Sequence, residues 1–75
     1  MKTQFNTFYI TNDGNTILCL HSHFVWKGDH KFYLYSWINK VIGKTLEDYI
    51  REDTIDVFFQ DGCVPLDNFF VSLTH

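Results

Sequence analysis

The sequence predicts an α+β fold, in which a small antiparallel sheet of four or five strands carries one or two short helices on one face. Two observations predict the sheet: runs in which apolar, β-branched and aromatic residues alternate with polar ones, and the Asn, Asp and Gly clusters between those runs. A capping pattern at residues 45–48 predicts a helix. The expected order of elements is β-β-β-α-β-β, and the length of 75 residues predicts a single domain over residues 1–75.

The first two strands are predicted at Gln4–Thr11 and Thr16–Trp26. The second run, TILCLHSHFVW, is long and rich in apolar, β-branched and aromatic residues, and we expect the rest of the fold to be arranged around it. Between the two runs lies Asn-Asp-Gly-Asn at residues 12–15, whose residue types tolerate positive φ. The two strands are therefore expected to form a tight hairpin.

In strand geometry the side chains of residues 16–26 alternate between two faces. One face is expected to form a wall of the core. Its members are Leu18, Leu20, Phe24 and Trp26, together with Ser22. The members of the opposite face are Ile17, Cys19, His21, His23 and Val25. The two imidazoles are thus expected on the side of the sheet away from the core.

After a reversal at Gly28-Asp29, a third strand is predicted at Lys31–Tyr35. Beyond it two interpretations compete, because apolar residues between 34 and 41 recur at helical spacing while the run KFYLYSW is strongly β-forming. We predict a strand through Tyr35 and a helix from about Trp37, which Gly43 would end in a left-handed conformation. A helix beginning at Asp29 is the alternative.

Residues 45–48, Thr-Leu-Glu-Asp, resemble a capping box, with a hydroxyl at the N-cap and acidic residues in the first turn. The turns that follow would place Leu46, Tyr49 and Ile50 on one stripe. A helix of two turns is unstable in isolation. We therefore expect this helix to dock on the sheet.

A fourth strand is predicted at Thr54–Gln60, with Ile55, Val57 and Phe59 on one side. Asp61-Gly62 is a turn signal. Because Pro65 cannot donate a hydrogen bond to a sheet, the returning strand is expected to start after it or to lie at an edge. The last strand is predicted at Asn68–Leu73.

The net charge of −3 is unevenly distributed, since residues 1–51 carry +2 and residues 52–75 carry −5. Without a basic stripe, direct binding to nucleic acid is not expected. No apolar run approaches the ~18 residues of a membrane span, and the N-terminal residues do not read as a secretory signal, so no membrane contact is expected. We expect a cytoplasmic protein with reduced thiols.

The 14 aromatic residues are more than a core of this size readily encloses, so we expect some of them at a surface that contacts a partner. The candidate contact residues are Tyr33, Tyr35 and Trp37, provided that a helix does not cover their face. The acidic C-terminal third favours a protein partner with a basic surface. The residues expected to steer it are Asp56, Asp61 and Asp67.

Cys19-x-His21-x-His23 is the pattern with the most chemical potential, because spacing of two in a strand places a thiol and two imidazoles on one face. Such histidine pairs ligate zinc when other ligands complete the site, and Cys63, Asp61 or His30 would be available. Structural zinc sites usually have a second close-spaced pair, which this sequence lacks. No metal or other cofactor is therefore expected.

The sequence holds no glycine-rich loop, serine elbow or phosphate cradle, so an enzyme is not expected. In size, acidity and aromatic content the chain is similar, as a class, to the short inhibitors of phages and mobile elements, anti-CRISPR proteins included, and to small immunity proteins and antitoxins. The expected function is therefore protein binding, with inhibition by occlusion of a partner. The alternatives are a structural homodimeric domain and a metal-binding protein that uses Cys19, His21 and His23.

Overall fold

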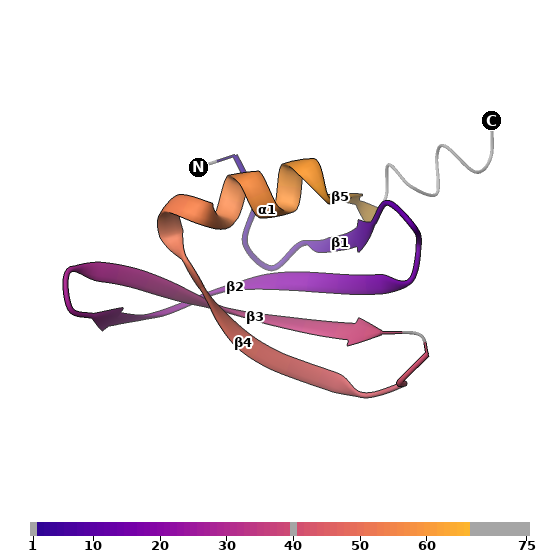
Figure 1. The fold of residues 1–75 in the computed structure, drawn as a ribbon, viewed down its shortest axis with the longest axis horizontal. Coiled ribbons are helices and arrows are strands. Elements are labelled where there is room, and N and C mark those ends of the chain that lie inside the picture. The colour runs from indigo at the N-terminus through magenta and orange to yellow at the C-terminus, as the bar shows by residue number, and fades with distance from the viewer. Residues whose placement is uncertain (1, 40, 67–75) are drawn as a thin grey trace.

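The computed structural model describes residues 2–39 and 41–66, which form a five-stranded antiparallel sheet and a short α-helix (Figure 1). The strands are β1 (Phe8–Thr11), β2 (Thr16–Lys27), β3 (His30–Asn39), β4 (Thr45–Arg51) and β5 (Cys63–Pro65). Between β4 and β5 lie the 3₁₀-helix η1 (Glu52–Thr54) and the α-helix α1 (Ile55–Asp61). The α+β class with a small antiparallel sheet is confirmed, but the order is β-β-β-β-α-β and not β-β-β-α-β-β.

The strands lie in the order β4-β3-β2-β1-β5, and every neighbouring pair is antiparallel. The predicted turns at residues 12–15 and Gly28-Asp29 join β1 to β2 and β2 to β3. Gly14 (φ 75°) and Gly28 (φ 62°) adopt the left-handed conformation, which glycine reaches without a steric penalty. Both hairpin predictions are confirmed.

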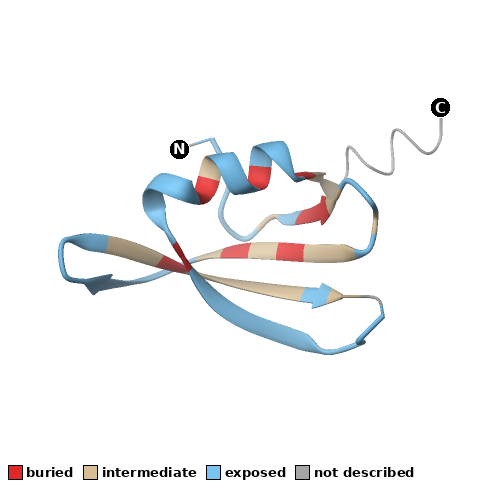
Figure 2. Ribbon diagram, in the orientation of Figure 1, coloured by how far each residue is buried: buried red, intermediate tan, exposed pale blue. Residues whose placement is uncertain are grey.

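The core lies between α1 and one face of the sheet, which we call the inner face; the opposite face is the outer face. The buried residues of the core are Tyr9, Leu18, Leu20, Tyr33, Ile50, Ile55, Phe59 and Cys63. On α1, Ile55 and Phe59 are four residues apart, so the helix turns a single apolar stripe toward the sheet. Figure 2 shows the buried positions beneath and along α1, whereas most of β4 and the end of the β2–β3 hairpin are exposed.

The predicted alternation along β2 holds, but the core covers only its first half. Leu18 and Leu20 are buried as predicted. Phe24 and Trp26 are 41% and 65% exposed, although their pairing with Tyr33 and Lys31 keeps them on the inner face. They belong to the part of the β2–β3 hairpin that extends past α1 (Figure 1). The core therefore extends along β2 only as far as α1 covers the sheet.

The predicted helix from Trp37 is wrong, and so is the alternative helix from Asp29, because residues 30–39 form β3. β3 is hydrogen-bonded to β2 on one side and to β4 on the other. A run of strong β-formers with partners on both sides is stabilised in the sheet whatever its apolar spacing. Gly43 does adopt a left-handed conformation (φ 72°), but in the connection between β3 and β4.

The helix predicted to start at the capping pattern of residues 45–48 and the strand predicted at Thr54–Gln60 are also wrong. The first segment contributes β4, since pairing with β3 satisfies its backbone, whereas a helix of two turns gains little alone. The second contributes α1. Ile55 and Phe59 are buried there while Val57, which the strand prediction placed on the same side, is 64% exposed. The buried residues of this segment, Ile55 and Phe59, are four apart as in a helix and not two apart as in a strand.

The two ends of the described chain differ from the prediction in length. The first strand begins at Phe8 and not at Gln4, because the chain turns at Asn6, which has φ 57°. The predicted turn at Asp61-Gly62 is the end of a helix and not a hairpin: α1 ends at Asp61, and the chain passes through Gly62 directly into β5. Pro65 ends this edge strand, as the edge alternative predicted. The predicted strand Asn68–Leu73 lies outside the described residues.

Candidate functional site

The outer face of the sheet carries no helix among the described residues, because α1 packs on the inner face. The cross-strand register identifies its side chains: one row, for example, runs from Phe8 through Cys19 and Ser36 to Glu47. The residues of the outer face on β2, β3 and β4 are Ile17, Cys19, His21, His23, Val25, Phe32, Leu34, Ser36, Ile38, Thr45, Glu47, Tyr49 and Arg51. With Phe8 of β1, they form the candidate site.

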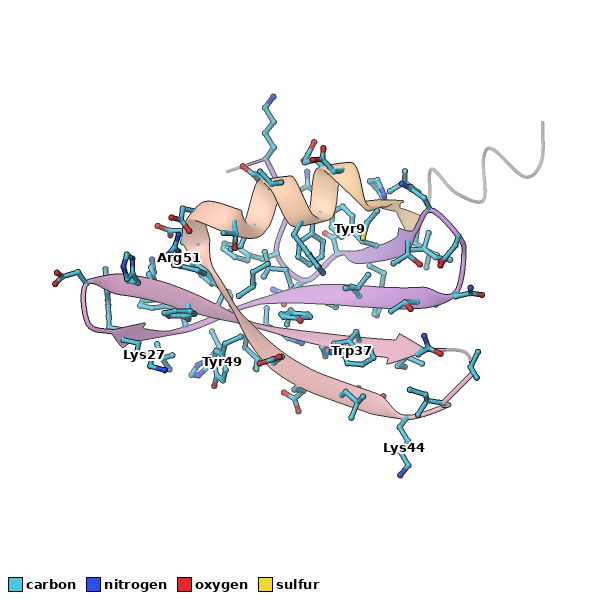
Figure 3. All side chains as sticks on the ribbon, viewed as in Figure 1. Tyr9, Lys27, Trp37, Lys44, Tyr49 and Arg51 are labelled. Atoms are coloured by element: carbon cyan, nitrogen blue, oxygen red, sulfur yellow. The ribbon has the colours of Figure 1, made fainter. Side chains whose placement is uncertain are left out.

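Large apolar side chains are exposed across this face. The most exposed are Phe8 (58%), Tyr49 (44%), Ile38 (42%) and Val25 (39%). Tyr49 points away from α1, whereas Tyr9 of the inner face points toward it (Figure 3). The four side chains come from four different strands, so they spread over the sheet. Contiguous exposed apolar surface marks sites that bind other molecules, and this face is the candidate for such a site.

An irregularity in β2 shapes the middle of the outer face. Leu20 pairs with Tyr35 and Phe24 with Tyr33, so residues 21–23 lie opposite Leu34 alone. β2 thus has two more residues than β3 in this stretch. Because the excess is even, the alternation of faces is preserved on both sides of the bulge. Such bulges often redirect side chains at functional sites. The bulge is where both histidines of the Cys-x-His-x-His pattern lie.

The two histidines have separate contacts on the outer face. His21 is half-buried, and its Nε2 is hydrogen-bonded to the hydroxyl oxygen of Ser36 at 2.8 Å. His23 is exposed, and its ring centroid lies 6.5 Å from that of Tyr49. The predicted position of both imidazoles, away from the core, is confirmed. They supply polar groups in the centre of an otherwise apolar surface.

Two hollows lie on the outer face, on either side of the histidines. One, of about 150 Å³, is lined by Phe8, Ile17, Leu18, Cys19, Ser36, Trp37, Ile38 and Thr45. The other, of about 330 Å³, is lined by Val25, Lys27, Phe32, Asp48 and Tyr49. Both hollows lie on the outer face, where single side chains of a partner protein can enter them.

The three aromatic residues that the sequence proposed as contacts lie on the inner face. Tyr33 is only 6% exposed, and its hydroxyl donates to Glu52 Oε2 at 3.2 Å. Tyr35 and Trp37 are partly buried against the core, and the Tyr35 ring lies 6.0 Å from that of Phe58 on α1. Burial, followed by the nearby Asp48, raises the pKa of Tyr35. The condition on which these contacts depended, a face free of helix, is therefore not met for Tyr33 and Tyr35.

The acidic residues proposed to steer a partner have different surroundings. The Asp56 carboxylate accepts the backbone N–H groups of Lys2 and Thr3, and hydrogen bonds, that of Thr3 first, lower its pKa. Asp61 is exposed at the end of α1. Asp67 lies outside the described residues. Two further acids have basic partners, since Glu52 lies 3.7 Å from the Lys31 amine and Asp53 lies 2.6 Å from Arg51 Nε. Much of the acidic charge is thus engaged within the chain.

The two thiols lie on opposite faces of the sheet, Cys19 on the outer face and Cys63 in the core. Both are free. Burial raises the pKa of Cys19, and burial together with the charge of Asp13 raises that of Cys63, so the thiolate form is disfavoured at both. Within residues 2–39 and 41–66, no three Cys, His, Asp or Glu side chains are grouped so that they could hold a metal ion.

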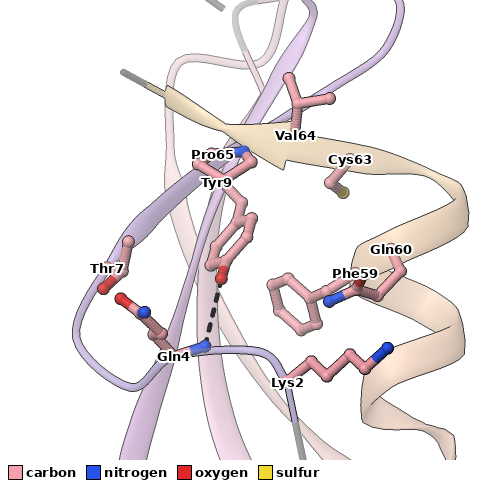
Figure 4. Close-up of a pocket in the computed structure, with 9 residues that line it drawn as sticks. All are labelled: Lys2, Gln4, Thr7, Tyr9, Phe59, Gln60, Cys63, Val64 and Pro65. Carbon is pink, nitrogen blue, oxygen red and sulfur yellow. Dashed lines mark hydrogen bonds between the residues drawn. The ribbon is translucent and has the colours of Figure 1, made fainter. Parts of the chain in front are cut away.

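Away from the outer face, a pocket of about 380 Å³ lies between the N-terminal segment, α1 and β5 (Figure 4). The Tyr9 hydroxyl accepts the backbone N–H of Gln4 at 3.1 Å on one wall, and Cys63 lies on another. The only thiol in this wall has a raised pKa. The pocket therefore presents hydrogen-bonding groups but no activated nucleophile of the cysteine type.

Sequence analysis identified the outer face of β2 but missed Phe8, Ile38 and Tyr49 as members of the same surface. Phe8 could have been assigned to this surface from the sequence, because the predicted hairpin at residues 12–15 pairs the first strand with β2. Ile38 and Tyr49 were not, since both had been assigned to helices. The extent of the site depends on β3 and β4, which the local pattern did not reveal.

Neither helix in the described part of the chain has the length and apolar character needed to cross a membrane. No family model, curated protein or solved structure matches this chain.

Proposed function

We propose that this chain is a non-enzymatic protein-binding module that inhibits a partner protein by occlusion, and that the outer face makes the contact. One observation carries the proposal: Phe8, Val25, Ile38 and Tyr49 are exposed together on a sheet face that α1 does not cover. Burying such a surface against a partner removes apolar area from water, at roughly 25 cal/mol per Å². This gain supplies the driving force for binding.

The chemistry of the outer face defines the partner that it would fit. Exposed apolar side chains from four strands surround the imidazoles of His21 and His23, and the exposed charged groups of Glu47 and Arg51 lie on the edge strand β4. An apolar surface with a few polar groups within it and charged groups at its edge matches a protein surface of the same layout. The partner is therefore a protein with an exposed apolar patch, and not a strongly basic surface, because Glu52, Asp53 and Asp56 already have partners within the chain.

A non-catalytic role is supported by the state of the two thiols, whose raised pKa values disfavour nucleophilic attack. Their placement on opposite faces prevents a bridge within one chain, which suits the reducing cytoplasm. Occlusion requires only a stable surface of the right shape. Inhibitors of phages and mobile elements, immunity proteins and antitoxins are the class in which we place this function.

The test is affinity capture with the wild-type chain and two outer-face variants, Phe8→Ser and Ile38→Ser. Val57→Ser is the matched control, because Val57 is 64% exposed on α1 and distant in the fold from the outer face. Circular dichroism would establish that all variants are folded. We expect a protein that is retained by the wild type and by Val57→Ser and is lost by both outer-face variants.

The captured protein, once purified, should lose its own activity when the wild-type chain is added in excess, and keep it when either outer-face variant is added. Capture that survives both outer-face substitutions would refute the proposed surface. Capture without any loss of the partner's activity would refute inhibition.

A further inference from the structure

β4 forms one edge of the sheet and exposes nearly its whole length. It pairs with β3 on one side, and on the other side no strand of the described residues lies against it (Figure 1). All seven of its residues except Ile50 are exposed. The opposite edge is short, since β5 has three residues and ends at Pro65, which has no N–H. An open edge of the length of β4 is a template for a further strand.

The contact between Asp48 and Tyr49 shows which backbone groups this edge presents. The N–H of Tyr49 donates to Asp48 Oδ1 at 2.8 Å, so it points away from β3. Backbone N–H directions alternate along a strand. Glu47 and Arg51 therefore also direct their N–H and C=O groups toward the open edge. Glu47, Tyr49 and Arg51 thus face the open edge, where Asp48 accepts the N–H of Tyr49 and the Thr54 hydroxyl donates to the Arg51 carbonyl oxygen at 2.8 Å. A second strand would displace the Asp48 contact and share the Arg51 carbonyl oxygen, which has two lone pairs.

Charge favours one register of pairing with a second copy of β4. In a two-fold symmetric antiparallel pair, one residue faces itself and the others pair symmetrically about it. A centre at Glu47 or at Asp48 would place two carboxylates directly opposite each other. A centre at Tyr49 places Glu47 of each copy opposite Arg51 of the other copy. This register replaces a repulsion by two attractive pairs.

Both charged side chains have capacity for this contact. No hydrogen bond or ion pair engages the Glu47 carboxylate within residues 2–39 and 41–66. Arg51 binds Asp53 through Nε at 2.6 Å. A guanidinium has further N–H donors on its terminal nitrogens. Arg51 can therefore hold Asp53 of its own chain and Glu47 of a second copy at once.

We propose that β4 is a self-association edge, through which two copies pair antiparallel about Tyr49 and join their sheets into one continuous sheet. The two Tyr49 rings then meet on the outer face, flanked on each side by a Glu47–Arg51 pair. This dimer goes beyond the proposed function, since it joins two copies through the backbone edge of β4; it shares Tyr49, Glu47 and Arg51 with the proposed contact surface but does not involve Phe8 and Ile38. In the dimer, the two outer faces lie on the same side of the combined sheet.

The test is a charge exchange at the two positions. In Glu47→Arg alone, both cross-pairs become Arg opposite Arg, and in Arg51→Glu alone both become Glu opposite Glu. In an equimolar mixture of the two variants, a mixed dimer has Arg opposite Glu at both pairs. We expect the dissociation constant of the dimer to be about tenfold or more higher for each variant alone than for the wild type. We expect the mixture to form dimers again.

Sedimentation at micromolar concentration and low salt measures these dissociation constants. Asp61→Arg and Lys2→Glu are matched controls, because they make the same changes of charge at exposed positions outside β4 and outside the hollow that Tyr49 lines. Both controls should dimerise like the wild type. A wild-type chain that remains monomeric, a Glu47→Arg variant that dimerises like the wild type, or a mixture that stays monomeric would each overturn the proposal. Recovery in the mixture also shows that neither variant is misfolded.

Discussion

The Asp56 carboxylate, in the first turn of α1, holds the N-terminal segment of the chain by accepting the backbone N–H of Thr3 at 2.9 Å. The same carboxylate accepts the backbone N–H of Lys2, at 2.9 Å and 3.0 Å to its two oxygens, and the hydroxyl of Thr3 at 3.0 Å. These bonds favour the charged form, so the pKa of Asp56 is lowered. A residue that the sequence offered for steering a partner thus has a structural task in the fold.

Asp56→Asn should therefore lower the free energy of unfolding at neutral pH. Because the pKa of the folded state lies below the ordinary value, the contribution is present above that ordinary value and is lost as the pH falls through the folded value. The difference between wild type and variant should narrow below about pH 4. Urea denaturation at a series of pH values measures it.

Asp61→Asn is the control for that experiment, because Asp61 is exposed and no hydrogen bond or ion pair in the described residues uses its side chain. Its stability should follow that of the wild type at every pH. A stability difference for Asp56→Asn that stays constant into the acid range would contradict the assigned role of the carboxylate.

Phe59→Ala should destabilise the chain far more than Val57→Ala. Phe59 is fully buried and its ring lies 5.2 Å from that of Tyr9, so truncation should cost about 3–5 kcal/mol. Val57 is mostly exposed on the other side of α1, and its truncation should change stability by less than about 0.5 kcal/mol. Equal effects at both positions would match a strand over residues 54–60 and would contradict the helix.

The hairpins could be predicted from the sequence because their determinants are local. Gly14 and Gly28 sit where the backbone needs a positive φ, and polar turn residues surround them. The side-chain alternation of β2 could be predicted for the same reason, since a spacing of two fixes which residues share a face. The alternation continues through the bulge at residues 21–23, because β2 has two residues more than β3 there and an excess of two keeps each side chain on its face.

The second half of the chain could not be assigned in the same way, because its local signals favour both structures. Thr45 and Asp48 fit a helix cap, yet they lie in β4, where β3 supplies the hydrogen-bonding partners. Ile55, Val57 and Phe59 fit a strand, yet Ile55 and Phe59 also fit one stripe of a helix. Tertiary contacts decided between them, and the outer face was incomplete in the sequence-based prediction until β4 was placed.

The two thiols should differ in their rates of alkylation by a small reagent such as iodoacetamide. Cys63 is buried in the core and its pKa is raised by burial and by Asp13, so it should react only when the chain unfolds. Cys19 is half-buried on the outer face and should react in the folded state, though more slowly than a free cysteine because burial raises its pKa too. Mass spectrometry of peptides resolves the two sites. Faster labelling of Cys63 than of Cys19 would contradict the assignment of Cys63 to the core and of Cys19 to the outer face.

Asp48→Ala should strengthen the self-association proposed for β4. The Asp48 carboxylate accepts the N–H of Tyr49, the group on which the proposed register is centred, and must release it before a second copy can pair there. Removing the carboxylate frees that N–H and takes a negative charge from the edge, so the dissociation constant of the dimer should fall. Asp48→Asn separates the two effects, because its amide oxygen can still accept the N–H while the charge is gone. If the acceptor is what guards the edge, Asp48→Asn should resemble the wild type in sedimentation and Asp48→Ala should not; weaker association of Asp48→Ala would show that Asp48 supports the edge and does not guard it.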